Sequence, residues 1–389
     1  MEVQLKGWNN KKMKNSNNYK ELFEIDEDIT YLNCSSMSPL LKSVKEAGIN
    51  ALERRARPWK LTDKDWFEDA EALRYKAAKI FQTSEDNIAF IPSASYGLAT
   101  AAKNLKIKTG KSIIIIEDQF PSNYYVWDEL SQKLGLKIIA VKKQNDKLLT
   151  DSILEKINSE TGIVAIPNCH WQDGTLINLE KISRAVKDVN AHLVLDLSQS
   201  LGALPININK VDPDFAVSIG YKWMLGPYSL GYMYVSPRWQ STGVPLEQNW
   251  SIRKGSDNFA KLTGYTTEYR TGARKFDMGE FSNFNTIRMA IAALEQILEF
   301  GIENIQSHTK VLTNLIAKYL IKDKTYQKPL TPNAGHIISV PIGNRNIESL
   351  KKKLSENKIF VSFRGTNIRI SPHLYNDASD IDKLINCLE

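Results

Sequence analysis

The sequence predicts an α/β fold, in which a large domain is built on a mostly parallel seven-stranded sheet between helices. Short apolar runs alternate with amphipathic helical patterns from about residue 45 onward, as expected for a parallel sheet covered by helices. Several runs are apolar on successive residues, which is typical of strands buried on both faces. The last two runs are joined too tightly for a crossover helix, so one strand is expected to be antiparallel.

These elements can be placed in order along the chain. Amphipathic segments, for example residues 65–81 and 178–190, predict helices that connect the strands. The strand candidates are "NIAFIP" (87–92), "KSIIIIED" (111–118), "KIIAV" (137–141), "TGIVAIPN" (161–168), "HLVLDLS" (192–198), "FAVSIG" (215–220) and "GYMYVSP" (231–237).

After residue 283 the pattern changes to that of a smaller α+β domain. The segment 285–301 places Ile287, Ile291, Leu294 and Leu298 at helical spacing, and Gly301 is expected to cap the helix. Further helix and strand patterns follow, and the early segment "ITYLNCSS" is expected to join them. The predicted division is a flexible arm (1–18), an N-terminal segment of the small domain (19–44), a large domain (45–285) and a small C-terminal domain (286–389).

Composition and charge exclude several classes of protein. The net charge is +7, but the lysines are scattered rather than gathered with aromatic residues into a stripe that would bind nucleic acid. No run is long enough to span a membrane. The three cysteines, Cys34, Cys169 and Cys387, lack the spacing of a disulfide framework or metal site. We therefore expect a cytoplasmic protein that binds neither nucleic acid, membrane nor metal, and whose positive charge attracts small anions.

Ligands of open α/β sheets bind at the carboxyl ends of the strands, so the residues after each run are candidates for a site. "SASYG" follows the first run, and Ser93, Ala94 and Ser95 could form a phosphate cradle at a helix N-terminus. The alternative is a simple helix cap.

Phe120 follows the second run and could lie over a flat ligand, or it could pack beneath a loop.

Two charged residues follow later strands. Asp196 closes a buried apolar run, where a carboxylate is costly unless it has a partner, and Gln199 could turn toward the same space. The alternative role for Asp196 is to hold a loop. Tyr221 and Lys222 end the next run, and a desolvated lysine there becomes a nucleophilic amine suited to a Schiff base. The alternative is a lysine whose amine reaches solvent.

The four strand-end features together are more informative than any one of them. An anion cradle, an aromatic ring, a buried aspartate and a lysine 26 positions later are the groups that pyridoxal 5'-phosphate (PLP) needs. In this interpretation Lys222 forms the Schiff base, and Asp196 keeps the pyridine nitrogen protonated.

The chain after the arm resembles the class V aminotransferase family of fold-type I PLP-dependent enzymes, which includes cysteine desulfurases, isopenicillin-N-epimerase-like proteins and kynureninases. "LDLSQSLGALPI" and "GYKWMLGPYSLGYMYV" resemble the family's cofactor and Schiff-base segments. The resemblance implies that residues 45–285 form the PLP-binding domain. It implies cofactor-binding roles for Ser93, Ala94, Ser95, Phe120, Asp196, Gln199, Tyr221 and Lys222, of which Lys222 and Asp196 would be catalytic.

The same resemblance suggests substrate-binding residues and an assembly. "NIRISPHLYN" is similar to the segment whose arginine, here Arg369, holds the substrate α-carboxylate, and "YLNCSSMSP" adds Asn33. In the segment "NCHWQDG", His170, Trp171 or Gln172 is expected to face the cofactor ring where the family usually has an asparagine followed by glycine. His170 is either a proton shuttle or a structural histidine. Arg364 either binds a second acidic group of the substrate or lies on a surface hairpin. Family members form homodimers, which places Gly279–Asn283 near the partner's cofactor, although Glu280 stands where the family usually has threonine.

The expected function is that of a PLP-dependent enzyme, similar to an aminotransferase, that acts on an amino acid through a Lys222 Schiff base. A PLP-dependent C–S or C–X lyase or an epimerase is the alternative. A persulfide-forming cysteine desulfurase is disfavoured, because "VSFRGTNIR" contains no cysteine. A nucleotide-dependent oxidoreductase lacks its glycine motif, and an inactive PLP-binding homologue is the non-enzyme alternative.

Overall fold

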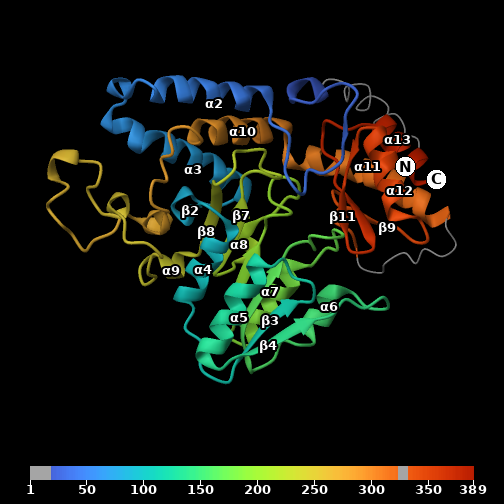
Figure 1. Cartoon of the computed structure of the whole chain (residues 1–389). Helices are drawn as coiled ribbons and strands as arrows, with labels where there is room; N and C mark the ends of the chain where they lie inside the picture. Colours follow the sequence, from blue (N-terminus) through green and yellow to red (C-terminus); the bar gives the residue numbers. More distant parts are fainter. Residues whose placement is uncertain (1–18, 323–331) are drawn as a thin grey trace, which may run out of the picture.

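A seven-stranded sheet runs through the centre of the larger part of the computed structural model, which describes residues 19–322 and 332–389 (Figure 1). Its strand order is β2-β8-β7-β6-β5-β3-β4, and β8 runs antiparallel to both of its neighbours. The remaining pairs are parallel. The predicted α/β class, the sheet and its antiparallel strand are therefore confirmed. The strands are β2 (Ile88–Ile91), β3 (Ser112–Ile116), β4 (Lys137–Val141), β5 (Thr161–Pro167), β6 (His192–Asp196), β7 (Phe215–Ile219) and β8 (Gly231–Val235).

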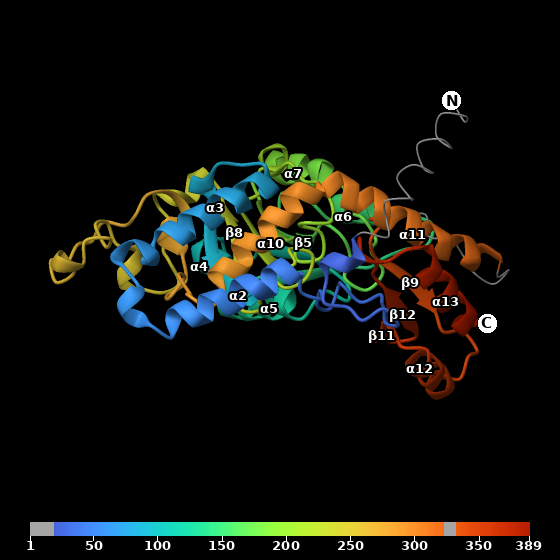
Figure 2. The same cartoon turned by 90° about the horizontal axis from the view of Figure 1, so that it is seen from above.

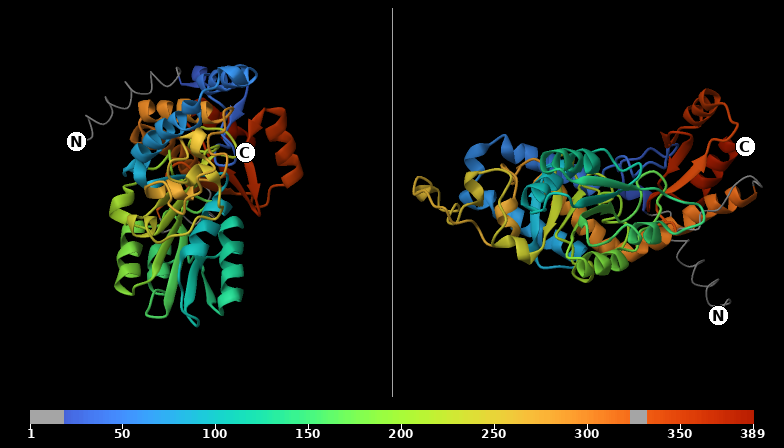
Figure 3. Two further views of the ribbon diagram at one scale, coloured as in Figure 1. Left: turned by 90° about the vertical axis from the view of Figure 1, so that its left-hand side faces the viewer. Right: turned by 90° about the horizontal axis from the view of Figure 1, so that it is seen from below.

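Helices cover both faces of this sheet, as the left panel of Figure 3 shows. In β3, Ile113 and Ile115 pack in one core, whereas Ile114 and Ile116 pack in the other. This alternation explains why the strand sequence is apolar at every position. The first face is covered by α4 (Ala94–Asn104) and α5 (Ser122–Leu134), and the second by α3 (Glu68–Phe81), α6 (Leu149–Leu154), α7 (Leu179–Asp188), α8 (Ile208–Val211) and α10 (Ile287–Phe300).

α10 lies between α2 (Lys42–Arg55) and α3, which run beside it in the view from above (Figure 2). The predicted helix and its glycine cap are present, with Gly301 at φ +74°. Its buried stripe differs from the prediction, because Ala290, Ala293 and Ile297 are buried while Leu298 is 37% exposed. The small alanine side chains allow close approach of the neighbouring helices, so the buried stripe is rotated toward them.

The smaller part is built on a three-stranded antiparallel sheet of order β11-β12-β9. The early strand β1 pairs in parallel with β10, so the expected joining of the N-terminal segment to this part is confirmed. The domain boundaries stay a prediction, and the proposed arm (1–18) lies outside the described residues. The elements are β1 (Thr30–Tyr31), β9 (Ile338–Pro341), β10 (Ile359–Phe360), β11 (Ser362–Arg364), β12 (Asn367–Ile370), α11 (Ile302–Lys322), α12 (Ile347–Glu356) and α13 (Ala378–Leu388).

Short helical turns complete the described structure. The segment that contains η7 projects from the larger part at the end opposite the small sheet (Figures 1 and 2). In the described ranges, no helix has both the length and the apolar character of a membrane span. The turns are α9 (Pro237–Gln240), η2 (Lys20–Leu22), η3 (Pro58–Lys60), η4 (Asp63–Trp66), η5 (Glu85–Asn87), η6 (Trp250–Ile252), η7 (Phe259–Lys261) and η8 (Gly272–Phe276).

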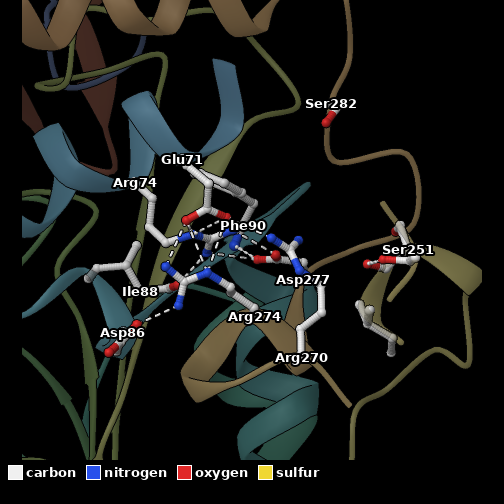
Figure 4. Close-up of polar contacts among 12 residues, drawn as sticks. Glu71, Arg74, Asp86, Ile88, Phe90, Ser251, Arg270, Arg274, Asp277 and Ser282 are labelled. Atoms are coloured by element: carbon white, nitrogen blue, oxygen red, sulfur yellow. Dashed lines mark hydrogen bonds and ion pairs between the residues drawn. The ribbon is translucent and has the colours of Figure 1, made fainter. Parts of the chain in front are cut away.

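The edge strand β2 is bonded along its open side by a buried ion pair instead of another strand (Figure 4). Asp277 accepts a hydrogen bond from the Phe90 amide at 2.8 Å and pairs with Arg74 at 2.8 Å. Arg74 also donates to the Ile88 carbonyl oxygen. These bonds satisfy backbone groups that an edge strand otherwise exposes. Because β2 leads directly into residues 93–95, the pair also fixes the entry to α4.

Candidate active site

The predicted cofactor-binding residues and His170 lie at the carboxyl ends of different strands of the large sheet. Because β2, β3, β5, β6 and β7 point the same way, the residues that follow them meet at one edge. In chain order these are Ser93, Phe120, His170, Asp196, which is itself the last residue of β6, and Lys222.

Lys222 is buried, with 7% of its surface exposed. Within the described ranges its Nζ has neither a hydrogen bond nor an ion pair, and it lies 5.5 Å from the centroid of the Phe120 ring. Burial lowers the pKa of Lys222 to about 8, opposed by the negative charge of Asp196 and assisted by the charges of Arg369 and Arg364. The amine is therefore held ready to act as a nucleophile.

Asp196 is a buried carboxylate with unused bonding capacity. Its Oδ1 accepts a hydrogen bond from the Ser198 amide at 3.0 Å. No ion pair reaches it from the part of the chain that the structure describes. A buried carboxylate is costly without a cationic or hydrogen-bonding partner, so Asp196 suits a ligand that presents a protonated ring nitrogen.

The segment before α4 forms an anion cradle. Ser93 caps the helix by accepting a hydrogen bond from the Tyr96 amide at 3.2 Å, and its hydroxyl lies 2.9 Å from that of Ser95. The amides of Ala94 and Ser95 have no acceptor among residues 19–322 and 332–389. Gly97 lets the helix approach β7, because a Cβ there would lie 2.5 Å from Val217. The helix cap and the phosphate cradle, the two alternatives for this segment, are therefore compatible. Ser93 caps the helix, and the free amides remain for a phosphate.

Gln199 is held from two sides by groups that the sequence analysis did not single out. Trp223 Nε1 donates to Gln199 Oε1, and Gln199 Nε2 donates to the Ser35 carbonyl oxygen, each at 3.0 Å. His336 Nε2 lies 2.6 Å from the Gln199 carbonyl oxygen. These bonds fix which end of the amide is the donor, and the second Nε2 hydrogen remains for a ligand.

Tyr221 lines the same region from the position before Lys222. Its ring is half-buried and lies 4.5 Å from that of Tyr228. Its carbonyl oxygen accepts from the Ser38 amide at 3.0 Å, so the N-terminal segment is attached directly to the lysine loop. Burial raises the pKa of the Tyr221 hydroxyl, which therefore stays protonated and able to donate.

Arg369 is almost fully buried, with 2% exposed, and lies on β12. Its guanidinium donates to the Trp171 carbonyl oxygen at 2.9 Å and to Ser36 Oγ at 2.7 Å, while its Nε has no partner. Burial, followed by the charge of Arg364, lowers the pKa of Arg369 to about 9. A buried arginine held by neutral groups alone is suited to an anionic ligand.

Asn33 is bonded to this arginine through Ser362, whereas His170 precedes Trp171, whose carbonyl oxygen the arginine binds. Asn33 Oδ1 accepts from Ser362 Oγ at 2.6 Å, and that hydroxyl also lies 3.4 Å from the Arg369 guanidinium. His170 Nδ1 lies 3.4 Å from Asp173 Oδ1, so the histidine is oriented by a carboxylate of its own loop. Asn33 therefore acts on the arginine through Ser362, a residue that sequence reasoning missed.

The segment Gly279–Asn283 is linked to α4 through Glu247. The Gly279 amide donates to Glu247 Oε2 at 2.6 Å, and Glu280 adopts a left-handed backbone at φ +56°. Burial, together with the charge of Glu247, raises the pKa of Tyr96 in the first turn of α4. The segment is thus connected through Glu247 to the helix that carries the cradle.

These residues fit PLP on three independent features. The free amides at α4 suit a phosphate, the buried Asp196 carboxylate suits a protonated pyridine nitrogen, and the unpartnered Lys222 amine suits an aldehyde. All three lie at the same sheet edge.

Comparison with known proteins agrees with this geometry. Residues 54–384 match the Aminotransferase class-V family. The chain is 24% identical to the uncharacterized aminotransferase YcbU of Bacillus subtilis over 95% of this chain and 96% of the relative. It is 25% identical to a kynureninase of Shouchella clausii over 95% and 90% of the two chains.

Among solved structures, a mutant of C-DES with glycine covalently linked to the PLP cofactor has the same fold. It superposes with a TM-score of 0.84 at 17% identity and covers 95% of this chain and 98% of that one. With the family match over most of the sequence, the conclusion is that this chain belongs to the class V aminotransferase family, that it is an enzyme, and that its cofactor is PLP.

Proposed function

We propose that the chain is an aminotransferase-type enzyme that acts on an amino acid through covalent attachment of Lys222 Nζ to PLP. The observation that carries this proposal is the state of the amine, which is buried, opposite Phe120, and lowered in pKa to about 8. Part of the lysine is then uncharged near neutral pH and able to attack a carbonyl carbon. Once released by the substrate's amine, the same Nζ can remove the proton from the substrate Cα and return it.

The surrounding residues would hold the cofactor. Asp196 would bind the ring nitrogen, Gln199 Nε2 the ring hydroxyl, and the Ser93–Ser95 segment with Tyr221 the phosphate. Phe120 would lie against the ring. Bound in this way, PLP supplies an electron sink for the charge that develops at Cα.

Arg369 would bind the substrate α-carboxylate. Its planar guanidinium suits two parallel hydrogen bonds to a carboxylate, and its buried Nε lacks a partner in the protein. Asn33 would support this contact through Ser362.

Absorption spectroscopy tests the attachment to Lys222. The purified protein with PLP should show a visible band that borohydride bleaches, and Lys222→Ala should abolish it. Lys275→Ala is the matched control, because Lys275 is also buried but donates to the Ser241 carbonyl oxygen outside the site. A protein that stays colourless with added PLP, or a band that survives in Lys222→Ala, would refute the proposal.

A lyase or epimerase is the second candidate. It is favoured by His170, because a histidine oriented by Asp173 supplies an acid–base group besides Lys222. A ketoacid that forms only with an amino acceptor would identify transamination. Release of ammonia or sulfide would identify a lyase, and loss of optical rotation without either product would identify an epimerase.

We also propose a cytoplasmic homodimer with Gly279–Asn283 near the partner's cofactor. Cys34, Cys169 and Cys387 are free and buried, which supports a reducing compartment. Exposed apolar side chains at one end of the molecule support self-association.

A further inference from the structure

Two arginines lie around one indole ring on the substrate side of the site. The guanidinium carbons of Arg364 and Arg369 are 5.6 Å and 5.9 Å from the centroid of the Trp171 ring. They come from neighbouring strands of the small sheet, β11 and β12. Within residues 19–322 and 332–389, neither arginine has a carboxylate partner.

The indole that both arginines contact is fixed in place. Trp171 Nε1 donates to the Asp118 carbonyl oxygen at 2.8 Å, and its own carbonyl oxygen accepts from Arg369 at 2.9 Å. Its ring also contacts Phe120 edge to face, with centroids 5.6 Å apart. Trp171 therefore connects the predicted cofactor-contacting ring to both arginines.

Arg364 has bonding capacity that its own chain does not use. Its Nη1 donates to the carbonyl oxygen of the preceding residue, Phe363, at 2.8 Å, and its buried Nε has no partner. The charge of Arg364 acts on both Arg369 and Lys222. Arg364 therefore faces the site, and its hairpin position does not make it a purely surface residue.

The charges of this region do not balance with a neutral amino acid. Arg364 and Arg369 are cationic, and the charge of Arg364 acts on both Arg369 and Lys222. At Lys222 the carboxylate of Asp196 opposes these charges. The α-carboxylate of a substrate would neutralise Arg369, but Arg364 would remain unpaired. Bringing two like charges into a partly desolvated site is costly, and a second anion removes that cost.

We propose that the substrate is an acidic amino acid, and that Arg364 binds the carboxylate or sulfinate at the end of its side chain. This inference rests on the proposed function, because it assigns the α-carboxylate to Arg369. Trp171, which both guanidinium groups contact, would help to set which substrates reach both.

Calorimetry with unreactive diacids tests the inference without requiring turnover. Glutarate and its monoamide would be titrated into the PLP-loaded enzyme and into Arg364→Gln. The variant should lose about 10- to 100-fold in affinity for glutarate, the usual effect of removing a charge-assisted contact, and less than about twofold for the monoamide. Arg369→Gln should weaken binding of both probes.

Lys351→Gln is the matched control. Lys351 lies 5.6 Å from the Phe363 ring beside the same hairpin and pairs with Glu348. It should leave the affinity for both probes unchanged. Arg364→Lys, which keeps the charge but not the planar group, should retain part of the glutarate affinity.

Amino-acid substrates then test whether the negative charge at the end of the side chain is recognised. Glutamate, aspartate and cysteine sulfinate should perturb the absorption band at lower concentration than glutamine and asparagine, and Arg364→Gln should remove this difference. Equal losses for glutarate and monoamide, or no loss for either, would overturn the inference while the Lys222-dependent band persists. Absence of that band would instead refute the proposed function.

Discussion

At the scale of single residues, the protonation state of Lys222 decides when the enzyme can be loaded. Burial lowers the pKa of this lysine to about 8 from an ordinary 10.5. The uncharged fraction therefore rises as pH passes through about 8, whereas an exposed lysine would remain charged there.

We expect the rate at which the apoprotein incorporates PLP to increase with pH with a midpoint near 8. Stopped-flow absorbance measures this rate. A range of about pH 6 to about pH 11 covers both the lowered pKa of about 8 and the ordinary lysine pKa of about 10.5. Arg369→Gln removes a cation that lowers the pKa of Lys222, so it should move the midpoint upward. A midpoint near that of free lysine would show that the amine is not desolvated.

At the scale of elements, the sheet edge at β2 depends on the ion pair between Arg74 and Asp277. Removing one partner of a buried pair leaves an uncompensated charge. Asp277→Ala also removes the acceptor of the Phe90 amide. We expect it to lower the free energy of unfolding by about 3–5 kcal/mol, measured by urea denaturation.

The control for this prediction is Glu348→Ala, which removes an exposed pair with Lys351. Exposed pairs contribute little, so the urea midpoint should hardly change. Similar small shifts for Asp277→Ala and Glu348→Ala would show that β2 does not need the buried pair. PLP affinity should fall only in the first variant, because β2 leads into the Ser93–Ser95 cradle.

Local elements of this fold could be predicted from the sequence, whereas contacts between distant segments could not. The seven strands could be predicted because a strand buried on both faces is apolar at successive positions. The location of Lys222 and Asp196 at the sheet edge could be predicted because each lies at the end of such a strand. The β2 edge could not be predicted, since Arg74 and Asp277 are 203 positions apart. The contact of Trp223 with Gln199 likewise needs two loops to meet. Alanine favours buried and exposed helix positions alike, so Ala290 and Ala293 did not identify the buried stripe of α10, and Leu298 was assigned to it instead.

At the scale of the whole molecule, large apolar side chains are exposed at the end opposite the small sheet. Tyr265 of the projecting segment is 93% exposed and Trp59 after α2 is 78% exposed. In Figures 1 and 2 the projecting segment and the turn after α2 lie at the same end of the molecule. Exposed aromatic side chains of this kind are candidates for a protein contact, so we expect the proposed homodimer to form a symmetric contact between two copies through this end.

Sedimentation velocity tests this assembly. The wild type should sediment as a species of twice the 44.1 kDa chain mass, and the pair Trp59→Glu and Tyr265→Glu should raise the dimer dissociation constant about tenfold or more. Ile321→Glu is the control, since Ile321 is 57% exposed on α11 near the other end. If the segment Gly279–Asn283 completes the partner's cofactor site, the double variant should also lose PLP on dilution while its fold persists. A wild type that sediments as a monomer at all concentrations would contradict the shared site, because each chain would then have to bind its cofactor alone.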